Sequence, residues 1–474
     1  MENNNNNNEN NKVTNNVTKK NRSKNSSTNN KNTEKDMSKN NESGVQSNQM
    51  GNNDEKVGQT AQEKVKGVLE EYMGKNNPIS KNIYLILIGF VIFLLIIVLF
   101  FFSSSFRNQQ SISSIKAYHR YQSIKNHREG DRNNQLSHFQ IASAFNPCNS
   151  SRPVFDYTST EVLKNILQAG ARYLDVKIFN ESFSENTHAV VSNGSKQGQW
   201  KLTLNNTSFD DFCKTIHEHA FNVSRKLDNN DSVGVNNFKD PLFIGLDLAT
   251  GRNLVTLNKM AKTILKYFSD RLLSREYRNI SQNLASIKMK DLEGKILFFS
   301  SDGYEGSQLR ELINATWDGP NATIERIHYF DLLQIIDIPE EEANKVTDDT
   351  PDQNEQSTGI KNFIQKTANK LVIVVPDKEG ELNIFKQQNY NPTHALNLGC
   401  QFVSLYYQSV DEYMNPYITK FKNYSVKLKP PDLRTKGTIV TDTTDKDPNY
   451  DTYRSLINRA TNVLKDITSK QTGT

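Results

Sequence analysis

An uncharged apolar run at residues 83–102 constrains the fold of this chain more than any other feature. A helix needs about 20 such residues to cross the hydrocarbon core of a bilayer, whereas a buried strand is much shorter. The run follows 82 mostly polar residues, so it is not placed like a cleavable signal peptide. We therefore predict one uncleaved transmembrane helix at 83–102, with a lipid bilayer as a partner of the chain.

The segments beside this run and at the C-terminus are polar. Residues 1–56 are rich in Asn, Lys and Ser and hold too few large apolar side chains to form a core, so we predict a disordered tail. Residues 57–82 are expected to form a juxtamembrane segment with a short amphipathic helix, and residues 103–135 a stalk. Residues 435–474 are predicted to be a tail with an amphipathic helix that packs on the folded domain.

The charges beside the apolar run do not decide its orientation. Lysines precede it and basic residues follow it within a similar distance, so the positive-inside rule gives almost no preference. The rest of the chain holds many Asn-x-Ser/Thr acceptor sequences for N-glycosylation. They include those that begin at Asn149, Asn180, Asn193, Asn206, Asn222, Asn279, Asn314, Asn321 and Asn423. Their number favours a type II single-pass membrane protein with a translocated C-terminal domain.

Charge and cysteine content exclude several classes of protein. The net charge of +5 is spread along the chain, and no zinc-finger or RNA-recognition motif is present, so no nucleic-acid partner is expected. Cys148, Cys213 and Cys400 lack the CxxC spacing of a zinc knuckle. They are either three buried thiols, which we favour, or one disulfide and one thiol.

Residues 136–434 alternate between short apolar segments and amphipathic segments. This alternation is typical of a parallel sheet with helical crossovers, and its seven or eight units fit an α/β fold of the (β/α)8 TIM-barrel type. The expected strands are 173–179, 189–192, 242–247, 295–300, 325–329, 371–375 and 402–407, and the expected helices are 159–167, 209–220, 257–272, 307–313 and 360–370.

Two further features refine this organisation. Gly170 stands where the helix before the strand at 173–179 needs a left-handed capping residue. An acidic, turn-rich stretch at 337–358 is expected to be an exposed linker between half barrels at 136–336 and 359–434.

Several segments together resemble the phosphatidylinositol-specific phospholipases C, and in particular the PLC-like proteins of large DNA viruses. The X region of that family is similar to IASAFN at 141–146, AGARYLDVKIFN at 169–180, DPLFIGLDL at 240–248 and LEGKILFF at 292–299. The Y region is similar to LVIVVPD at 371–377, LNLGCQFVSLYYQSVDEYM at 396–414 and VKLKPPDLR at 426–434. The resemblance covers nearly all of 136–434, and 337–358 then corresponds to the X–Y linker.

The resemblance implies chemistry on a phosphodiester, but this chain lacks the usual proton-transfer groups. In the family one histidine takes a proton from the inositol 2-hydroxyl and a second protonates the leaving oxygen, while Ca²⁺ or a basic side chain neutralises the phosphoryl oxygens. The histidine positions are occupied by Phe145 and by the segment Ser192, Asn193, Gly194. Other family positions are replaced as well. The positions of the inositol-phosphate lysines hold Phe299 and Ser301, and those of an Arg and a Tyr hold Ile373 and Val375.

Five residues remain as candidates for the site. The resemblance places Asp175 and Asp247 at acidic positions and Lys177 where another acid is expected, so we name these three as a catalytic remnant. It implies that Asn146 and Arg172 contact substrate. A lysine beside the two acids disfavours Ca²⁺ binding, so no cofactor is expected.

Three functions remain open. The first is a membrane-anchored, catalytically degenerate PLC-like barrel that acts as a binding or structural module. The second is an active, Ca²⁺-independent phosphoric diester hydrolase for a phospholipid or glycerophosphodiester, with Lys177 as the phosphate clamp and Asp175 or Asp247 as the base. The third is an attachment or fusion protein that uses the barrel to contact a glycan or receptor.

Overall fold

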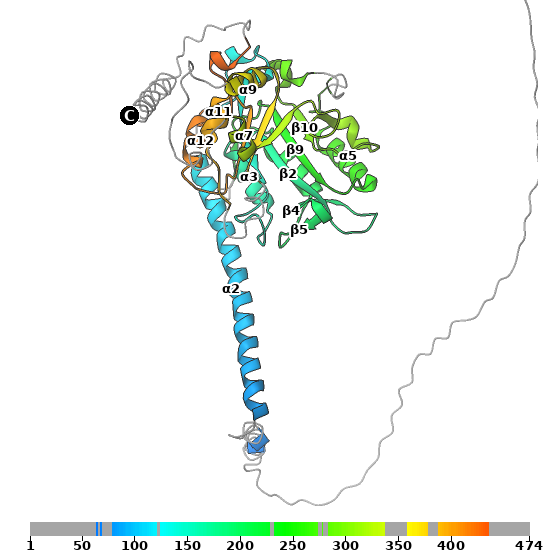
Figure 1. The fold of residues 1–474 in the computed structure, drawn as a ribbon, viewed down its shortest axis with the longest axis vertical. Helices are drawn as coiled ribbons and strands as arrows, with labels where there is room; N and C mark the ends of the chain where they lie inside the picture. Colours follow the sequence, from blue (N-terminus) through cyan, green and yellow to red (C-terminus); the bar gives the residue numbers. More distant parts are fainter. Residues whose placement is uncertain are drawn as a thin grey trace, which may run out of the picture. The chain divides into compact units, whose positions relative to one another are not determined.

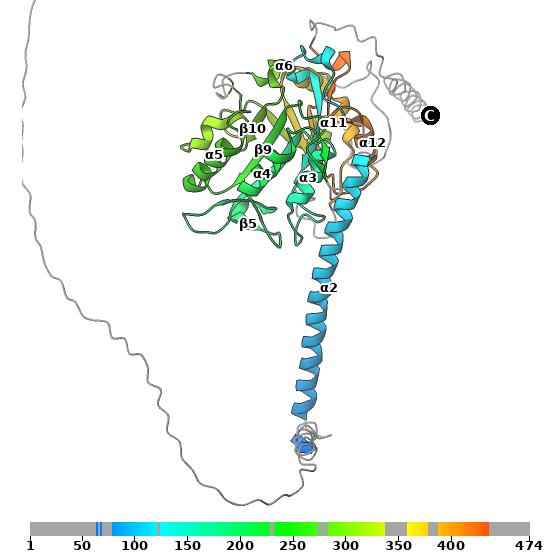
Figure 2. The same cartoon turned by 180° about the vertical axis from the view of Figure 1, so that it is seen from behind.

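The computed structural model describes residues 63–64, 67–68, 78–120, 124–227, 232–273, 277, 283–336, 358–377 and 387–435. The chain separates into two compact units, Met1–Ile88 and Gly89–Thr474. The described part of the first unit is helical, and the second unit holds the folded domain, seen from two sides in Figures 1 and 2. The predicted tail at 1–56 and nearly all of the predicted linker and C-terminal helix lie outside the described residues.

Helix α2, Pro78–Arg120, contains the predicted transmembrane segment. Within it, Asn82–Tyr118 is the one stretch of the described chain that is long and apolar enough to cross a membrane, and none of its most apolar window is buried. By length and composition this supports a single membrane-spanning helix. The helix does not end with the apolar run but continues through half of the predicted stalk.

Eight parallel strands curve into the central sheet of the folded domain. Their order is β11-β10-β9-β2-β1-β14-β13-β12, and every neighbouring pair is parallel. Neighbours in the sheet also follow one another along the chain, as in a TIM barrel, so the predicted fold class is confirmed. The strands are β1 Phe139–Phe145, β2 Tyr173–Asn180, β9 Leu242–Ala249, β10 Ile296–Ser300, β11 Ile313–Thr316, β12 Glu325–His328, β13 Val372–Val375 and β14 Phe402–Leu405.

The barrel has one seam, between β11 and β12. These end strands form no ladder within the described chain; the carbonyl of Thr316 accepts the N–H groups of Thr323 and Ile324 at 2.9 and 3.2 Å. The helix predicted at 307–313 is a 3-10 helix, Gln308–Leu312, that leads into β11. The strand predicted at 189–192 exists as β3, Ala189–Val191, but it pairs antiparallel with the end of β2 outside the barrel.

The remaining elements surround this sheet. Short strands extend it or form hairpins: β4 Gly194–Ser195, β5 Trp200–Lys201, β6 Thr207–Ser208, β7 Arg225–Lys226, β8 Ser232–Val233 and β15 Val426–Leu428. The helices are α3 Thr160–Gln168, α4 Phe209–His219, α5 Leu254–Phe268, α6 Met289–Leu292, α7 Tyr329–Ile335, α9 Thr358–Asn369, α11 Pro392–Asn397 and α12 Met414–Lys420.

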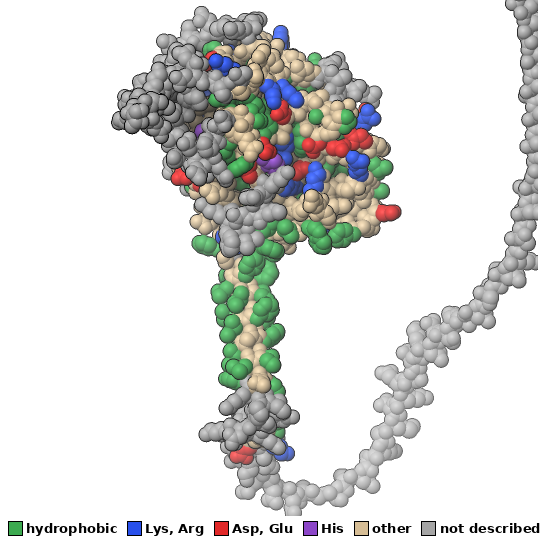
Figure 3. Space-filling model, in the orientation of Figure 1, with side chains coloured by type: hydrophobic (Ala, Val, Ile, Leu, Met, Phe, Trp, Pro, Cys, Tyr) green, Lys and Arg blue, Asp and Glu red, His purple; other side chains and the backbone are tan. Residues whose placement is uncertain are grey.

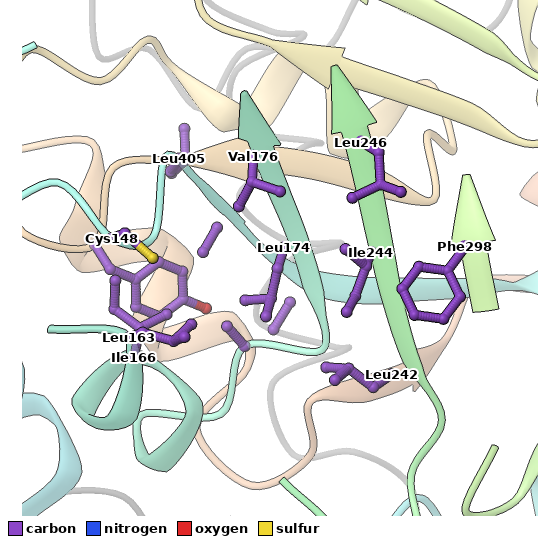
Figure 4. Close-up of a cluster of buried hydrophobic side chains, with 14 of the residues drawn as sticks. Cys148, Leu163, Ile166, Leu174, Val176, Leu242, Ile244, Leu246, Phe298 and Leu405 are labelled. Atoms are coloured by element: carbon purple, nitrogen blue, oxygen red, sulfur yellow. The ribbon is translucent and has the colours of Figure 1, made fainter. Parts of the chain in front are cut away.

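Side chains of the barrel strands alternate between two apolar cores. The outward side chains, such as Leu174, Val176 and Ile244, pack beneath the surrounding helices (Figure 4). The inward side chains, such as Tyr173 and Phe243, fill the interior of the barrel. This two-residue period decides which polar side chains of each strand point into the barrel.

Gly170 ends the helix before β2, as the sequence predicts. α3 begins after Ser159, whose hydroxyl accepts the N–H of Glu161. Gly170 has a φ of 98°, a conformation that costs glycine little and other residues more. A Cβ at this position would lie 2.6 Å from Ile124, so the turn also requires glycine for space.

The predicted stalk at 103–135 forms part of the folded domain. Ile112 and Ile115 of α2 are buried in the outer core of the barrel. Beyond the helix, the backbone N–H and Nδ1 of His127 each lie 2.8 Å from Oδ1 of Asp240. The three cysteines are buried and free, as favoured from the sequence.

Candidate functional site

Five charged side chains gather at the C-terminal face of the barrel, by which we mean the C-terminal ends of its strands and the loops that follow them. Val176 and Ile178 of β2 belong to the outer core, so Asp175 and Lys177 point into the barrel. The charged cluster consists of Asp175, Lys177, Lys196, Asp247 and Arg326. It brings together all three residues that the sequence predicted as a catalytic remnant.

Asp175 and Arg326 form a buried, two-pronged ion pair. The Nη2 and Nε atoms of Arg326 donate to the two carboxylate oxygens of Asp175 at 3.2 and 3.3 Å. The side chain of Asp175 is fully buried and that of Arg326 is 9% exposed. The guanidinium also lies over the rings of Trp317 and Phe145, 5.3 and 5.9 Å from their centroids, which adds cation–π attraction. This geometry fixes both charges inside the barrel.

A tyrosine and a glycine complete the surroundings of Asp175. The hydroxyl of Tyr173 donates to Oδ2 of Asp175 at 2.8 Å. Gly245 lies beside Asp175 on β9, and a Cβ there would meet the Tyr173 hydroxyl at 2.2 Å. Gly245 therefore makes room for this hydrogen bond, as glycine within a strand often does where groups approach closely.

Asp247 is held by two lysines. Lys177 lies opposite Asp247 on the neighbouring strand. Nζ of Lys196, from the turn after β4, donates to Oδ1 of Asp247 at 2.9 Å. The side chain of Lys196 is 48% exposed and that of Asp247 is 12% exposed, so Lys196 is the member of this pair that solvent reaches. The sequence did not single out Lys196, although it lies just beyond the segment where the second family histidine is expected.

The environments of the two carboxylates shift their pKa values in opposite directions. Burial raises the pKa of Asp175, and Arg326 only partly opposes this rise. Burial also acts to raise the pKa of Asp247, but Arg326, Lys196 and Lys177 outweigh it and hold that pKa below its usual value. Asp247 is therefore a weakened base, and Asp175 is engaged by Arg326, so neither is suited to take a proton from a hydroxyl.

Phe145 and Asn146 lie at the end of β1, next to Asp175. Phe145 is the register partner of Asp175, and its buried ring meets that of Tyr406 edge to face at 5.3 Å. The first family histidine position is thus an apolar contact of the charged cluster. Asn146 is 3% exposed, its N–H donates to the carbonyl of Asp175 at 2.9 Å, and its Nδ2 has no partner among the described residues. Asn146 therefore offers an amide donor next to the cluster.

Arg172 is not part of this arrangement. It precedes β2, at the opposite end of the strand from Lys177. Its guanidinium donates to the carbonyl of Ala220 at 2.9 Å and to the carbonyl and side-chain oxygen of Asn237 at 2.6 and 2.7 Å. The predicted substrate contact is therefore a buried residue that joins two loops at the N-terminal ends of the strands.

His328 is a residue at this face that the sequence reasoning missed. Ile327 belongs to the outer core, so Arg326 and His328 point inward from β12. Nδ1 of His328 lies 2.8 Å from the carbonyl of Pro376. Because a carbonyl only accepts, Nδ1 carries the proton and Nε2 is the basic nitrogen. The alternation around Ile327 was the signal in the sequence that could have revealed both residues.

In the family that this chain resembles, certain positions hold inositol phosphates. Here those positions carry either a buried apolar side chain or a polar side chain that is already hydrogen-bonded within the protein. Phe299, Ile373 and Val375 are fully buried in the inner core, and the hydroxyl of Ser301 accepts the N–H of Leu248 at 2.8 Å. Asn193, in the segment expected to carry the second histidine, is buried and donates to the carbonyl of Pro153 at 2.6 Å. Among the described residues, the charged and polar side chains of the site therefore come from β1, β2, β9, β12 and the turn after β4.

The donor set does not fit the Ca²⁺ ion that the resemblance implies for eukaryotic members. Both oxygens of Asp175 accept from Arg326, and Asp247 accepts from Lys196. Ca²⁺ needs six to eight oxygen ligands, and the described residues contain no group of three or more His, Cys, Asp or Glu side chains arranged around a metal position. Cationic side chains occupy the region where the ion would lie.

A comparison with known protein families supports the PLC-like superfamily for this barrel. A family model described as phosphatidylinositol-specific phospholipase C, X domain, matches residues 132–301. The match runs from just before β1 to just after β10, and it confirms the resemblance at the level of the PLC-like superfamily. No curated protein matches the chain.

Solved phospholipases C are among the structures to which the chain is similar. PLC21 of L. pealei is 15% identical with a TM-score of 0.49, over 64% of this chain and 38% of that one. A calcium-dependent phosphoinositol-specific phospholipase C from Pseudomonas sp. is 11% identical with a TM-score of 0.36, over 65% and 98%. The enzyme from Listeria monocytogenes is 16% identical with a TM-score of 0.32, over 61% and 94%. The chain thus spans well under half the length of L. pealei PLC21.

Replacing Arg326 is expected to destabilise the barrel. In Arg326→Met the carboxylate of Asp175 loses its buried partner, so the free energy of unfolding should fall by about 3–5 kcal/mol. Adding Asp175→Asn should restore part of this loss, because the uncompensated charge is removed. Urea unfolding followed by circular dichroism measures both values.

The exposed pair of Arg252 and Asp302, 3.0 Å apart, supplies the control. Arg252→Met should change stability by less than about 1 kcal/mol. Equal effects of Arg326→Met and Arg252→Met would contradict a structural role for the buried pair.

Proposed function

We propose that this chain is a membrane-anchored PLC-like barrel that binds the phosphodiester of a lipid headgroup and has lost the usual two-histidine hydrolysis. The charge balance of the cluster carries the proposal. Three cationic side chains face two carboxylates, which leaves one net positive charge within the charged cluster. A phosphodiester carries one negative charge, and Lys and Arg side chains are the usual groups that bind it.

Each cationic group has a distinct part in this proposal. Lys196 is half exposed and is the first charge that an entering phosphate meets. Lys177 is 5% exposed and supplies charge from within the barrel. Arg326 is held by Asp175, so it contributes a positive electrostatic field and not a free hydrogen-bond donor. The amide of Asn146 adds a neutral donor for a phosphoryl oxygen.

Binding should depend on Lys177. In Lys177→Met we expect the affinity for glycerophosphoinositol, a soluble phosphodiester, to fall roughly 10-fold or more, because a hydrogen bond to a charged group contributes about 1.5–3 kcal/mol. Isothermal titration of the full chain in detergent micelles at low and high salt measures the affinity.

Lys366→Met is the matched control. Lys366 makes an ion pair with Glu325 at 3.1 Å and is 40% exposed, and α9, which carries it, is not part of the cluster. Lys366→Met removes one positive charge, as Lys177→Met does. The affinity of the Lys366→Met variant should nevertheless stay within about twofold of that of the parent chain. Equal loss in the two variants, or no binding by the parent chain, would reject the proposed site.

Hydrolysis of a phosphodiester is the second candidate function, and His328 is the observation that favours it. Asp175, Lys177 and Asp247 do share the C-terminal face, as an active site would require. The two acids are poorly suited as bases, whereas Nε2 of His328 is the ring nitrogen that the carbonyl of Pro376 does not engage. In this candidate function His328 replaces the missing histidines as the general base and Lys177 neutralises the phosphoryl oxygens.

We expect no cleavage of phosphatidylinositol, a lysophospholipid or a glycerophosphodiester above the level of a Lys177→Ala control. The reason is that each missing acid or base removes about 10²–10⁴-fold in rate. Product release is followed by ³¹P NMR. Clear turnover that drops at least about 100-fold in His328→Gln would instead establish the second candidate.

The proposed orientation is type II, with the barrel translocated. Nine acceptor sequences motivate it, and the structure separates them by exposure: Asn222 and Asn321 are exposed, whereas Asn193 and Asn314 are buried. In a secretory pathway the exposed sites should carry glycans and Asn314 should not. The measurement is a gel shift on N-glycosidase treatment of the parent chain and of Asn222→Gln and Asn314→Gln. An unglycosylated chain whose barrel is digested outside sealed vesicles would show the opposite orientation.

A further inference from the structure

Helix α2 is attached to the C-terminal face of the barrel. Nε of Arg107 lies 3.4 Å from Oδ2 of Asp156, which is fully buried in the loop after β1. One or two turns later Ile112 and Ile115 enter the outer core, and Lys116 lies 3.6 Å from Glu161 in the first turn of α3. The polypeptide then continues to Lys125, whose N–H donates to the carbonyl of Asn423 at 2.8 Å, and on to the start of β1.

These contacts give α2 a direction relative to the barrel. The loop after β1 and the first turn of α3 both belong to the C-terminal face, because α3 follows a strand that ends there. Within the second unit, the part of α2 from Gly89 to Arg107 therefore extends from that face. Figures 1 and 2 agree: this part of α2 leaves the barrel on the side where the β4–β5 hairpin lies.

The distance from the apolar run to the barrel is short. Phe102, the last residue of the run, is 76% exposed and precedes Arg107 by five residues. At about 1.5 Å per helical residue this separation is about 7.5 Å along the helix. The headgroup layer on each side of a bilayer is of similar thickness, roughly 5–8 Å. A bilayer around the run would therefore reach the loops of the C-terminal face.

The same face exposes large apolar side chains. Among the described residues after α2, every exposed Phe or Trp lies on its loops, and aliphatic side chains lie beside them; four other exposed aliphatic residues lie elsewhere. Figure 3 shows hydrophobic side chains along the edge of the folded domain from which α2 leaves. The exposed residues at this face are Phe155 in the loop after β1, Phe183 and Trp200 in the segment between β2 and α4, Leu254 and Val255 in the first turn of α5, and Val410 after β14.

The backbone of one of these residues is strained. Phe155 has a φ of 53°, which bulky residues rarely adopt, and its side chain is 48% exposed. Its N–H donates to the carbonyl of Leu202 at 2.7 Å, which holds the loop in this conformation. Strain that leaves an aromatic ring in solvent is typical of a binding surface.

We propose that α2 holds the C-terminal face of the barrel against the same bilayer that the helix crosses. Phe155, Phe183 and Trp200 then lie in the headgroup layer, and Lys196 meets phosphodiesters of that leaflet. The ligand is accordingly a headgroup of the anchoring membrane and not a lipid of a second membrane. The inference rests on the proposed anchoring and headgroup binding. It adds the orientation of the barrel, with its C-terminal face toward the bilayer that α2 crosses.

The chain has two tryptophans, which permits a direct test on the full protein in phosphatidylcholine vesicles that contain phosphatidylinositol. Bromine-labelled phosphatidylcholine should quench the emission of the parent chain, and Trp200→Phe should remove about half or more of that quenching, because Trp200 lies at the interface. Adding Lys290→Trp to Trp200→Phe should not restore it. Lys290 is exposed on α6, close to the N-terminal ends of the strands.

Each outcome is decisive. The inference is supported if replacing Trp200 removes the quenching while flotation on vesicles is unchanged. The inference is overturned if the chain floats but its quenching is the same with and without Trp200, or if Lys290→Trp restores the quenching. The proposed anchoring and headgroup binding would then still stand. A chain that does not float with vesicles overturns the anchoring and the inference together. Phe155→Ser with Phe183→Ser should reduce Trp200 quenching while flotation persists, and full quenching in that variant would also count against the inference.

Discussion

The buried ion pair between Asp175 and Arg326 joins parts of the barrel that backbone hydrogen bonds leave apart. β12 is an end strand of the sheet, and β13, β14 and β1 lie between it and β2. The pair therefore crosses the interior, near the seam where β11 and β12 share no ladder. Burying two charges is costly, and the cost is offset only when the geometry satisfies their hydrogen bonds. Here a two-pronged contact and the hydroxyl of Tyr173 provide those bonds.

This interaction also determines what the site is able to do. Because Asp175 is engaged by Arg326, it is not available as a metal ligand or as a base. Arg326, Lys196 and Lys177 together outweigh burial and lower the pKa of Asp247, which reduces its basicity. The result is a set of ion pairs with a surplus of positive charge, facing an inner core that is apolar where the resembling enzymes hold polar groups. This surplus of positive charge is the basis on which we propose that the site retains an anion.

Much of the fold followed from local patterns, but the site followed only in part. The period of β2 and the matching segment at β9 were sufficient to place Asp175, Lys177 and Asp247 on one face. Arg326 lies 151 residues from Asp175, and no local pattern reports a contact of that separation. Arg172 was assigned by its place in a motif, although a residue before a parallel strand lies at the wrong end for this site. The helical stalk was missed because its apolar residues are too few to form a stripe.

The burial of Ile112 and Ile115 links the assembly of this protein to the order in which it is made. A chain is synthesised from its N-terminus, so earlier segments exist before later ones, whereas a domain generally folds as a unit. α2 is synthesised before any barrel strand, and the outer core of the barrel later packs against side chains that the helix supplies. Helix α2 thus supplies part of the core of the domain that follows it in the chain. Cleavage between the helix and the barrel would release a domain whose outer core lacks Ile112 and Ile115.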